Sequence, residues 1–284
     1  MKLANLGGRA VLMVTDTEAF DVATASAGRF GPALPAVYAD WTEFARWASF
    51  WLGGSGRDSG ETVAVDAHRL QAPSPEARQV FGIGLNYRAH AEESGRDLPA
   101  KPATFTKFPG SITGPFAEVE LPEGGSTDWE VELVVVMGQR AHRVAAADAW
   151  SHVAGLTVGQ DLSERNLQFA AGMQFSLGKS YPGFGPIGPW LVSPDEFDDP
   201  DDLELWCSVD GVEMQRSRTS DLIFTVPALI EELSAVLALC PGDLIFTGTP
   251  AGVGMARQPP TFLQPGQVVV SGIEGIGEIV TRFR

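Results

Sequence analysis

The hydrophobic positions of the chain fall into short runs that are separated by turns rich in glycine and proline. Several of these runs contain β-branched residues, which pack well on the pleated surface of a sheet. The runs predict strands at residues 10–14, 62–65, 79–84, 133–136, 153–160, 203–209, 243–247 and 268–273.

Helical patterns are fewer. Aromatic residues have helical spacing at residues 41–48, and residues 225–239 form an amphipathic pattern that ends before a proline and a glycine. Residues 86–93 are expected to begin another helix, whereas the glycines and prolines at residues 182–189 predict a loop. With 32 glycines and 20 prolines, the chain is expected to form many turns and short strands, not a helical bundle.

The character of the sequence changes near residue 72. The aromatic residues before this point are expected to form a small core, and no motif there suggests chemistry. A glycine-rich stretch at residues 53–60 predicts a flexible break, and the prolines at residues 72–75 predict a stiffer one. We therefore expect a small N-terminal domain at residues 1–72 and a larger domain at residues 73–284.

The net charge argues against two classes of partner. The formal charge is −16 at pH 7, so the phosphates of nucleic acids and the surface of an anionic membrane would be repelled. No stretch approaches the roughly 20 apolar residues that span a bilayer, and no signal peptide is evident. Cys207 and Cys240 lie among apolar residues and are expected to be buried thiols in a reducing compartment. These features predict a soluble, cytoplasmic protein.

Two glutamates that precede the most apolar strand are the first candidates for chemistry. Glu130 and Glu132 stand at i and i+2, so both side chains point to one face of an extended chain. Paired carboxylates at the edge of an apolar core repel each other and lose hydration, and a hard cation such as Mg²⁺ relieves both costs. A strand end that is simply solvated is the alternative. Asp161, which follows the strand at residues 153–160, is either a third metal ligand or a helix N-cap.

A candidate general base lies on the helix expected after residue 86. His90 and Glu93 stand at i and i+3, which lets the carboxylate orient the imidazole and raise its basicity. An ordinary exposed pair of helix residues is the other interpretation. Lys179 precedes the glycine- and proline-rich stretch, where it is either a compact positive charge in a site or a surface residue. The sequence has no G-x-S-x-G elbow, P-loop, H-E-x-x-H or C-x-x-C motif.

Five motifs in order resemble those of the fumarylacetoacetate hydrolase superfamily. They are Gly84-Leu85-Asn86-Tyr87-Arg88-Ala89-His90, Asp128-Trp129-Glu130-Val131-Glu132-Leu133, Gln160-Asp161-Leu162-Ser163-Glu164-Arg165-Asn166-Leu167-Gln168, Leu177-Gly178-Lys179-Ser180 and Pro241-Gly242-Asp243-Leu244-Ile245-Phe246-Thr247-Gly248-Thr249-Pro250. The resemblance runs from about Phe81 to the C-terminus. It implies an α+β fold that is predominantly β, with a mixed β-strand roll as the catalytic domain, a small N-terminal α/β domain and assembly as a homodimer.

The resemblance also implies a role for each candidate residue. By motif position, the ligands of Mg²⁺ or Mn²⁺ are Glu130, Glu132 and Asp161. The base dyad of a mobile lid is His90 and Glu93, and the lysine beside the metal-bound oxyanion is Lys179. The implied contacts with the substrate's carboxylate or keto oxygens are Arg165, Gln168 and Thr249.

The implied reaction is hydrolysis of a carbon–carbon bond in an acylpyruvate or another 2,4-dioxo acid, giving pyruvate and a carboxylic acid. In this interpretation His90 takes a proton from the attacking water, and Lys179 lies where negative charge develops. The alternative is metal-dependent decarboxylation or isomerisation of oxaloacetate or of an oxo-diacid from aromatic ring cleavage. A third interpretation, a ligand-binding protein without activity, is disfavoured by the intact dyad and carboxylates.

Overall fold

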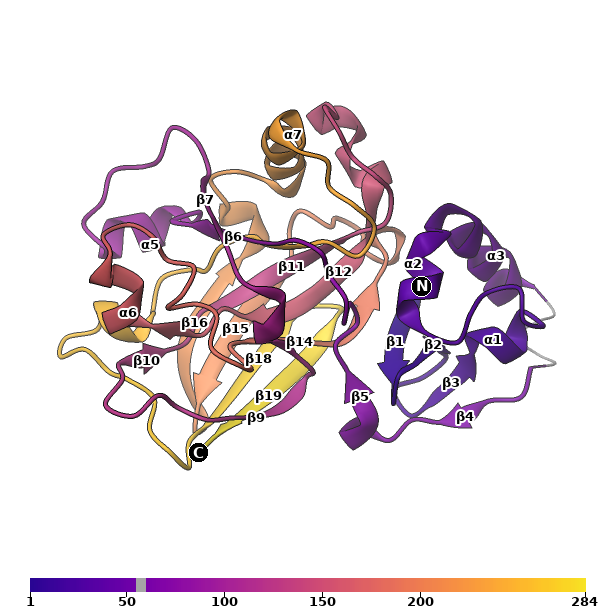
Figure 1. The fold of residues 1–284 in the computed structure, drawn as a ribbon, viewed down its shortest axis with the longest axis horizontal. Coiled ribbons are helices and arrows are strands. Elements are labelled where there is room, and N and C mark those ends of the chain that lie inside the picture. The colour runs from indigo at the N-terminus through magenta and orange to yellow at the C-terminus, as the bar shows by residue number, and fades with distance from the viewer. Residues whose placement is uncertain (55–59) are drawn as a thin grey trace.

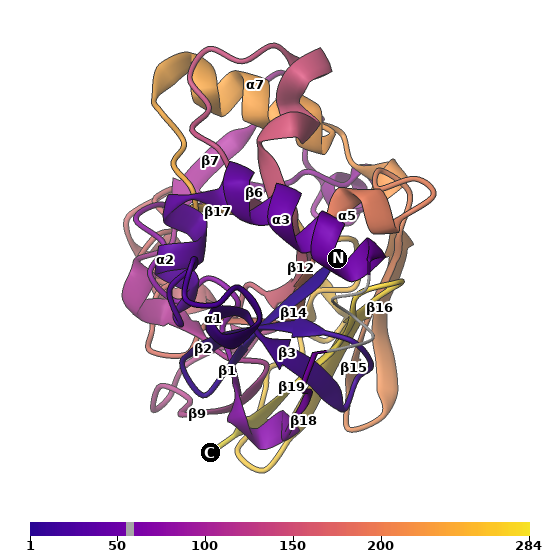
Figure 2. The same cartoon turned by 90° about the vertical axis from the view of Figure 1, so that its right-hand side faces the viewer.

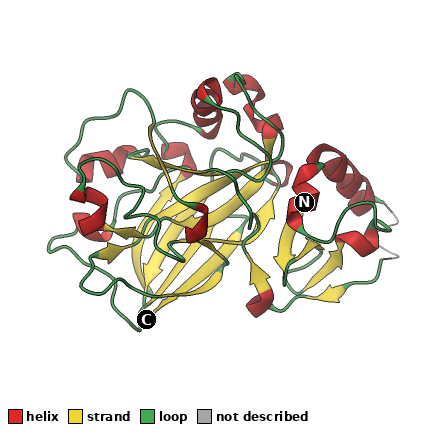
Figure 3. Cartoon of the chain, in the orientation of Figure 1, coloured by secondary structure: helices red, strands yellow, loops and turns green. Residues whose placement is uncertain are grey.

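Strands predominate in the computed structural model, which describes residues 1–54 and 60–284 (Figure 3). Part of the glycine-rich stretch expected at residues 53–60 therefore lies outside the described residues. The strands form a large mixed sheet, a five-stranded sheet and a two-stranded ribbon. This arrangement confirms the prediction of an α+β fold that is predominantly β.

The large sheet has the strand order β4-β3-β2-β1-β14-β12-β11-β17-β6-β7, and β5 and β8 pair with β1 and β14 outside this path. Its strands are β1 (Lys2–Leu6), β2 (Arg9–Met13), β3 (Glu18–Asp21), β4 (Val63–Ala64), β5 (Leu70–Gln71), β6 (Val80–Gly84), β7 (Ala103–Thr106), β8 (Ile112–Thr113), β11 (Val131–Met137), β12 (Val153–Gln160), β14 (Gly185–Val192) and β17 (Leu244–Phe246). Most neighbours are antiparallel, but β17 runs parallel to β6, and β14 runs parallel to β8.

The smaller sheet has the order β16-β15-β18-β19-β9, in which β19 and β9 are parallel. Its strands are β9 (Phe116–Val119), β15 (Glu204–Val209), β16 (Val212–Arg218), β18 (Val268–Ile273) and β19 (Gly277–Phe283), and the two-stranded ribbon consists of β10 (Thr127–Asp128) and β13 (Ser163–Glu164).

Short helices connect these strands. The α-helices are α1 (Val22–Ala25), α2 (Leu34–Ala39), α3 (Trp41–Gly53), α5 (Arg88–Glu93), α6 (Arg165–Ala170) and α7 (Val226–Val236). The 3₁₀ turns are η1 (Ala67–Arg69), η2 (Pro109–Ser111), η3 (Ala146–His152), η4 (Pro194–Glu196), η5 (Thr219–Asp221) and η6 (Gly254–Ala256). Helices α3, α5 and α7 confirm the predicted helical patterns. None of the described helices combines the length and apolar character that crossing a membrane requires.

The N-terminal segment lies beside the strand roll, as Figures 1 and 2 show in indigo. The two parts are joined by hydrogen bonds, because β1 pairs with β14, with Leu3 opposite Leu191. They also share a core, in which Trp41 and Phe44 of α3 cluster with Val134 of β11. The division at residue 72 remains a prediction, and both parts contribute strands to one sheet.

Strand β11 is buried on both faces, and its alternate residues fill two different cores. Leu133 and Val135 belong to the larger core, whereas Val134 and Val136 belong to the core under the N-terminal helices. Because strand side chains alternate, Glu132 lies on the same face as Val134 and Val136. The strand therefore delivers a carboxylate to the end of an apolar layer.

The loop predicted at residues 182–189 is wrong over most of its length. Residues from Gly185 onward form β14, which is buried throughout and lies between β1 and β12. The glycines and prolines favour a loop locally, but hydrogen bonding to β1 and β12 on the two sides holds this segment as a strand. Gly188 is needed at its position, since its φ is +146° and an added Cβ would lie 2.7 Å from the Pro115 side chain.

Both cysteines are free thiols. Cys207 on β15 is buried as expected, and burial raises the pKa of its thiol to about 12. Cys240 is only partly buried, contrary to the expectation, because it lies in the turn that leads into β17.

Candidate metal centre and active site

Three carboxylates meet where β11 begins and β12 ends. Antiparallel pairing puts Glu132 opposite Gly159, so Glu130, just before β11, lies close to Asp161, just after β12. One oxygen from each of the three side chains lies within 4.8 Å of the others. Within the described part of the chain, this is the one group of acidic, histidine or cysteine side chains with the spacing of a metal site. The structure thus brings together the three predicted ligands.

The carboxylates are almost fully shielded from solvent. Burial, followed by the negative charges of Asp161 and Glu130, raises the pKa of Glu132 well above its usual range. For Glu130, burial also raises the pKa, but the positive charges of Lys179 and Arg165 outweigh it and bring the pKa to about 2. The centre is therefore a site of crowded negative charge that depends on cations.

Two buried lysines contact this centre. Lys179 Nζ donates to Glu130 Oε2 at 2.5 Å and to Asp161 Oδ2 at 2.7 Å. Lys107 Nζ donates to Asp161 Oδ1 at 2.6 Å, to the Phe184 carbonyl at 3.1 Å and to the Lys179 carbonyl. The second oxygen of Asp161 is thus held by Lys107 from inside the protein. The sequence reasoning did not identify Lys107, although a lysine is conspicuous in a chain that uses mostly arginine.

Arg165 also forms ion pairs with carboxylates. One guanidinium nitrogen lies 2.7 Å from Glu130 Oε1 and 2.7 Å from Asp128 Oδ1, and another donates to Gln168 Oε1 at 2.8 Å. Among the described residues, its Nε has no hydrogen-bond partner although it is buried. Arg165 and Gln168 therefore form a connected pair beside the metal centre.

The donor set fits a hard divalent cation. All three ligand groups offer carboxylate oxygen, which Mg²⁺ and Mn²⁺ favour, and no sulfur or imidazole belongs to the group. Burial, followed by the neighbouring negative charges, raises the pKa of Glu132, and a bound cation would remove this electrostatic cost.

His90 and Glu93 face each other on α5. His90 Nδ1 lies 2.7 Å from Glu93 Oε1, and both side chains are mostly shielded from solvent. A carboxylate at this position favours the tautomer with the proton on Nδ1, which leaves Nε2 free to accept a proton. The predicted dyad is thus formed geometrically.

One loop supplies backbone donors to three separate carboxylates. We call residues 248–255 the amide loop. Its Gly248 N–H donates to Glu132 Oε2 at 2.7 Å, and its Met255 N–H donates to Asp128 Oδ2 at 2.7 Å. Between them, the Gly252 N–H reaches both oxygens of Glu93 at 3.0 and 3.1 Å.

Gly252 has no room for a side chain. Its φ is +106°, and an added Cβ would lie 2.1 Å from the Met214 carbonyl oxygen. The resemblance implied that Thr249 contacts the substrate. In the structure, Thr249 Oγ1 donates to the Val131 carbonyl at 2.9 Å and accepts from Gln215 Nε2 at 2.7 Å. The hydroxyl of Thr249 therefore helps to anchor the loop.

A cavity of about 280 Å³ connects the dyad to the metal centre. The predicted residues that line it are His90, Glu93, Glu130, Arg165, Gln168, Lys179 and Thr249. Glu132 and Asp161 are buried beside Glu130. All nine predicted site residues therefore gather around one cavity.

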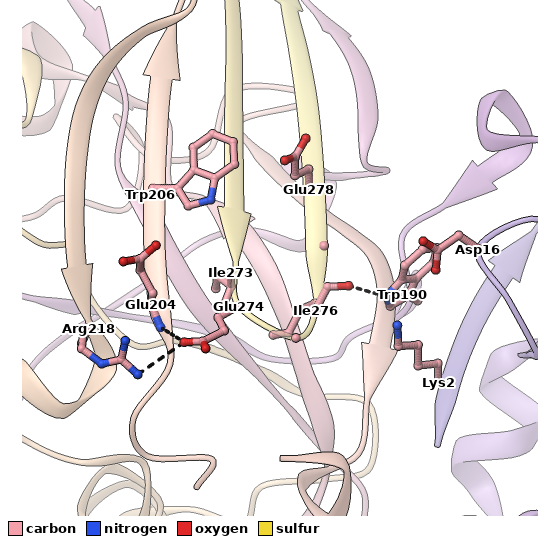
Figure 4. A pocket seen from close by; sticks show the side chains of 12 residues that line it. Lys2, Asp16, Trp190, Glu204, Trp206, Arg218, Ile273, Glu274, Ile276 and Glu278 are labelled. Carbon is pink, nitrogen blue, oxygen red and sulfur yellow. Dashed lines mark hydrogen bonds and ion pairs between the residues drawn. The ribbon is translucent and has the colours of Figure 1, made fainter. Parts of the chain in front are cut away.

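A second hollow, of about 540 Å³, differs in its chemistry (Figure 4). It lies where the β18–β19 turn faces Lys2 and Asp16 of the N-terminal segment. Its Glu274 carboxylate accepts hydrogen bonds from Arg218 at 3.3 Å and from the Glu204 N–H at 3.0 Å. The Glu274 and Arg218 side chains of this hollow are thus paired with each other, so the first cavity is the better candidate for catalysis.

Known proteins share this fold and sequence. A family model described as fumarylacetoacetate (FAA) hydrolase C-terminal matches residues 79–284. A protein of Burkholderia cenocepacia (strain HI2424), named provisionally as a hydrolase, is 49% identical over 232 residues, covering 78% of this chain and 82% of that protein.

Two solved structures extend the likeness to the whole chain. A protein of Mycobacterium smegmatis, described provisionally as HpcE, is 51% identical with a TM-score of 0.90, covering 100% of this chain and 99% of the other. A maleylpyruvate hydrolase of Sphingobium sp. SYK-6, solved with manganese(II) and pyruvate, is 25% identical with a TM-score of 0.80, covering 100% and 98%.

Proposed function

The chain belongs to the fumarylacetoacetate hydrolase family, and we propose that it hydrolyses a carbon–carbon bond in an acylpyruvate or another 2,4-dioxo acid. The products are pyruvate and a carboxylic acid. The observation that carries the proposal is the meeting of a carboxylate triad and a His–Glu dyad at one cavity.

Glu130, Glu132 and Asp161 would hold a divalent cation, Mg²⁺ or Mn²⁺. When bound there, the cation supplies Lewis acidity toward the oxygens of the 2-oxo acid group. Lys107 and the Gly248 N–H keep one oxygen of Asp161 and one of Glu132 occupied, which orients the remaining oxygens.

His90 acts as the general base in this proposal. Its Nε2 accepts a proton from water while the water oxygen forms a bond to the C4 carbonyl carbon. The C3–C4 bond then breaks, its electron pair passes to the pyruvate enolate, and C3 regains a proton from the imidazolium. Water supplies the oxygen and hydrogen that balance the two products. Glu93 stabilises the charged imidazole, and the Gly252 N–H holds Glu93 in place.

Lys179 and Arg165 would stabilise negative charge on the substrate. Lys179 lines the cavity, and its Nζ contacts Glu130 and Asp161, so an oxyanion that develops beside the metal centre would be close to its positive charge. The side chains of Arg165 and Gln168, which both line the cavity, would orient the substrate's carboxylate. The hydroxyl of Thr249 would act mainly through the loop that it anchors.

Decarboxylation of oxaloacetate or a related oxo-diacid is the second candidate, with isomerisation as a variant of it. The carboxylate triad and Lys179 form a unit that does not include the α5 dyad, and decarboxylation needs only that unit because no water attacks.

Product analysis decides between these functions. The protein, supplied with Mg²⁺ or Mn²⁺, is incubated with acetylpyruvate and separately with oxaloacetate. Equal amounts of pyruvate and acetate from acetylpyruvate, lost on chelation and restored by metal, support the hydrolase. Release of CO₂ from oxaloacetate without turnover of acetylpyruvate would favour the decarboxylase. Sedimentation of the same sample tests the proposed homodimer.

A further inference from the structure

The positive charges that line the cavity are not equivalent. Lys179 and Arg165 are buried, and each contacts two carboxylates. Arg96 also lines the cavity, but it forms no ion pair with any residue that the structure describes. Its side-chain contact is a hydrogen bond from Nη1 to the Met173 sulfur at 3.7 Å, and a thioether is a weak acceptor. Arg96 is thus an exposed guanidinium with no charged partner among the described residues.

The backbone fixes Arg96 directly after the dyad helix. Gly95 adopts a φ of +62°, and the Arg96 N–H donates to the Ala91 carbonyl at 3.0 Å, which closes the end of α5. Arg96 therefore belongs to the same ordered segment as His90 and Glu93. A ligand group that contacts Arg96 also contacts the segment that carries the base.

The rest of the cavity has an apolar wall. Phe175 packs edge-on against Phe105 and Phe169, with ring centroids 5.8 and 5.6 Å apart, and all three residues line the cavity. The lining thus contains a charged metal centre, an aromatic surface suited to a carbon chain, and a free cation.

We propose that Arg96 forms a subsite for a carboxylate at the far end of the substrate, so that the enzyme selects oxo acids with a second, distal carboxylate over those with a neutral tail. This inference rests on the proposed function, because it takes the 2-oxo acid end of the substrate to lie at the metal centre. A guanidinium binds a carboxylate through two parallel hydrogen bonds, which the Met173 sulfur does not provide. In a chain of net charge −16, an anionic tail is attracted most strongly to a cation that is not already paired with a carboxylate of the protein.

Binding of unreactive probes tests the subsite separately from catalysis. 2-Oxoadipate and 2-oxohexanoate have the same carbon chain and differ in the distal carboxylate, and neither is a 2,4-dioxo acid. We expect Mn²⁺-supplemented protein to bind 2-oxoadipate roughly 10- to 100-fold more tightly in calorimetric titration, the range for a hydrogen bond to a charged group. Arg96→Met should abolish most of this difference, and Arg96→Lys should restore part of it.

Arg88→Met is the matched control. Arg88 is exposed, lies on α5, which ends shortly before Arg96, and does not line the cavity, so its loss removes the same charge from the same segment. The control should retain the preference for 2-oxoadipate. Equal binding of the two probes by the unmodified protein, or an equal loss of preference in the Arg88 and Arg96 variants, would overturn the subsite.

Kinetics then separates failure of the subsite from failure of the proposed function. If neither acetylpyruvate nor a 2,4-dioxo diacid such as fumarylpyruvate is hydrolysed, the hydrolase proposal fails, while the binding comparison still decides the role of Arg96. If both are hydrolysed, Arg96→Met should lower kcat/KM for fumarylpyruvate alone. An equal fall for both substrates would mean that Arg96 supports the fold of the segment, and it would refute the subsite.

Discussion

The N-terminal segment and the metal centre bury side chains of opposite kinds. In the first, aromatic rings of α2 and α3 pack against one another, as in the Tyr38–Trp41 and Trp41–Phe44 pairs, whose centroids lie 5.6 and 5.5 Å apart. In the second, the buried groups are charged and joined by hydrogen bonds. Apolar packing is non-directional, whereas buried charges need partners at defined positions. Substitutions in the two regions should therefore affect different measurable quantities.

The largest expected effect follows from removing the proposed general base. His90→Ala should lower kcat on an acylpyruvate by roughly 10²–10⁴-fold, because the variant lacks the imidazole proposed to take the proton from water. Mn²⁺ affinity should be unchanged, since His90 is not among the predicted ligands. Steady-state kinetics and metal titration measure both quantities, with the exposed His68→Ala as control. Hydrolysis by the variant at a near-normal rate would refute the role of His90.

A truncation in the aromatic core should lower the free energy of unfolding but should leave metal affinity unchanged. Phe44→Ala should lower the free energy of unfolding by about 3–5 kcal/mol, because the fully buried ring leaves a cavity. Phe50 lies on the same helix and is 83% exposed, so Phe50→Ala should change little. Urea unfolding gives both values. If folded Phe44→Ala protein lost its metal affinity, the proposed separation of the two regions would be wrong.

The third effect concerns the lysine beneath the metal centre. Lys107→Met should weaken Mn²⁺ binding by roughly 10- to 100-fold, because one oxygen of Asp161 loses the donor that orients it. Lys101→Met is the control, as that side chain is 76% exposed and pairs with Glu232 on the surface. Unaltered metal affinity in the Lys107 variant would show that Lys179 alone orients Asp161.

The smallest effect is a pH-dependent one in the N-terminal segment. Arg9 donates to Asp21 at 2.6 Å and, although burial opposes it, lowers the pKa of that carboxyl to about 2. The folded pKa is below the unfolded value of about 4, so the stabilisation is complete above pH 4 and is lost as the pH falls toward 2. Asp21→Asn should cost about 1 kcal/mol at pH 7, since Arg9 is half exposed. Urea titrations at pH 7 and pH 3 should show a smaller cost at the lower pH.

Sequence patterns predicted those parts of the site in which local spacing determines geometry. Glu130 and Glu132 stand at i and i+2 where β11 begins, and His90 and Glu93 stand at i and i+3 on α5, so local chain geometry brings each pair together. Asp161 was open to interpretation as an N-cap, but the cap of α6 is Glu164, whose side chain accepts from two backbone N–H groups. That observation removes the alternative and leaves Asp161 with the other two carboxylates.

The remaining features depend on contacts between distant segments. Lys107 becomes part of the site only in the folded chain, where its Nζ donates to the carbonyls of Lys179 and Phe184. Strand β14 is specified by its neighbours β1 and β12 in spite of its glycines and prolines. Backbone donors such as the Gly252 N–H are present in every residue except proline, so a sequence motif does not predict which acceptor they bind.

The amide loop limits how this protein can diverge. Its donors belong to the main chain, so side chains such as those of Ala251 and Met255 can be exchanged while every donor is retained, whereas Gly252 must remain a glycine. A change in loop length is different, because one inserted or deleted residue would displace the donors for Glu93 and Asp128 relative to the donor for Glu132. Diversification of this site should therefore proceed by residue replacement in the loop, with its length held constant.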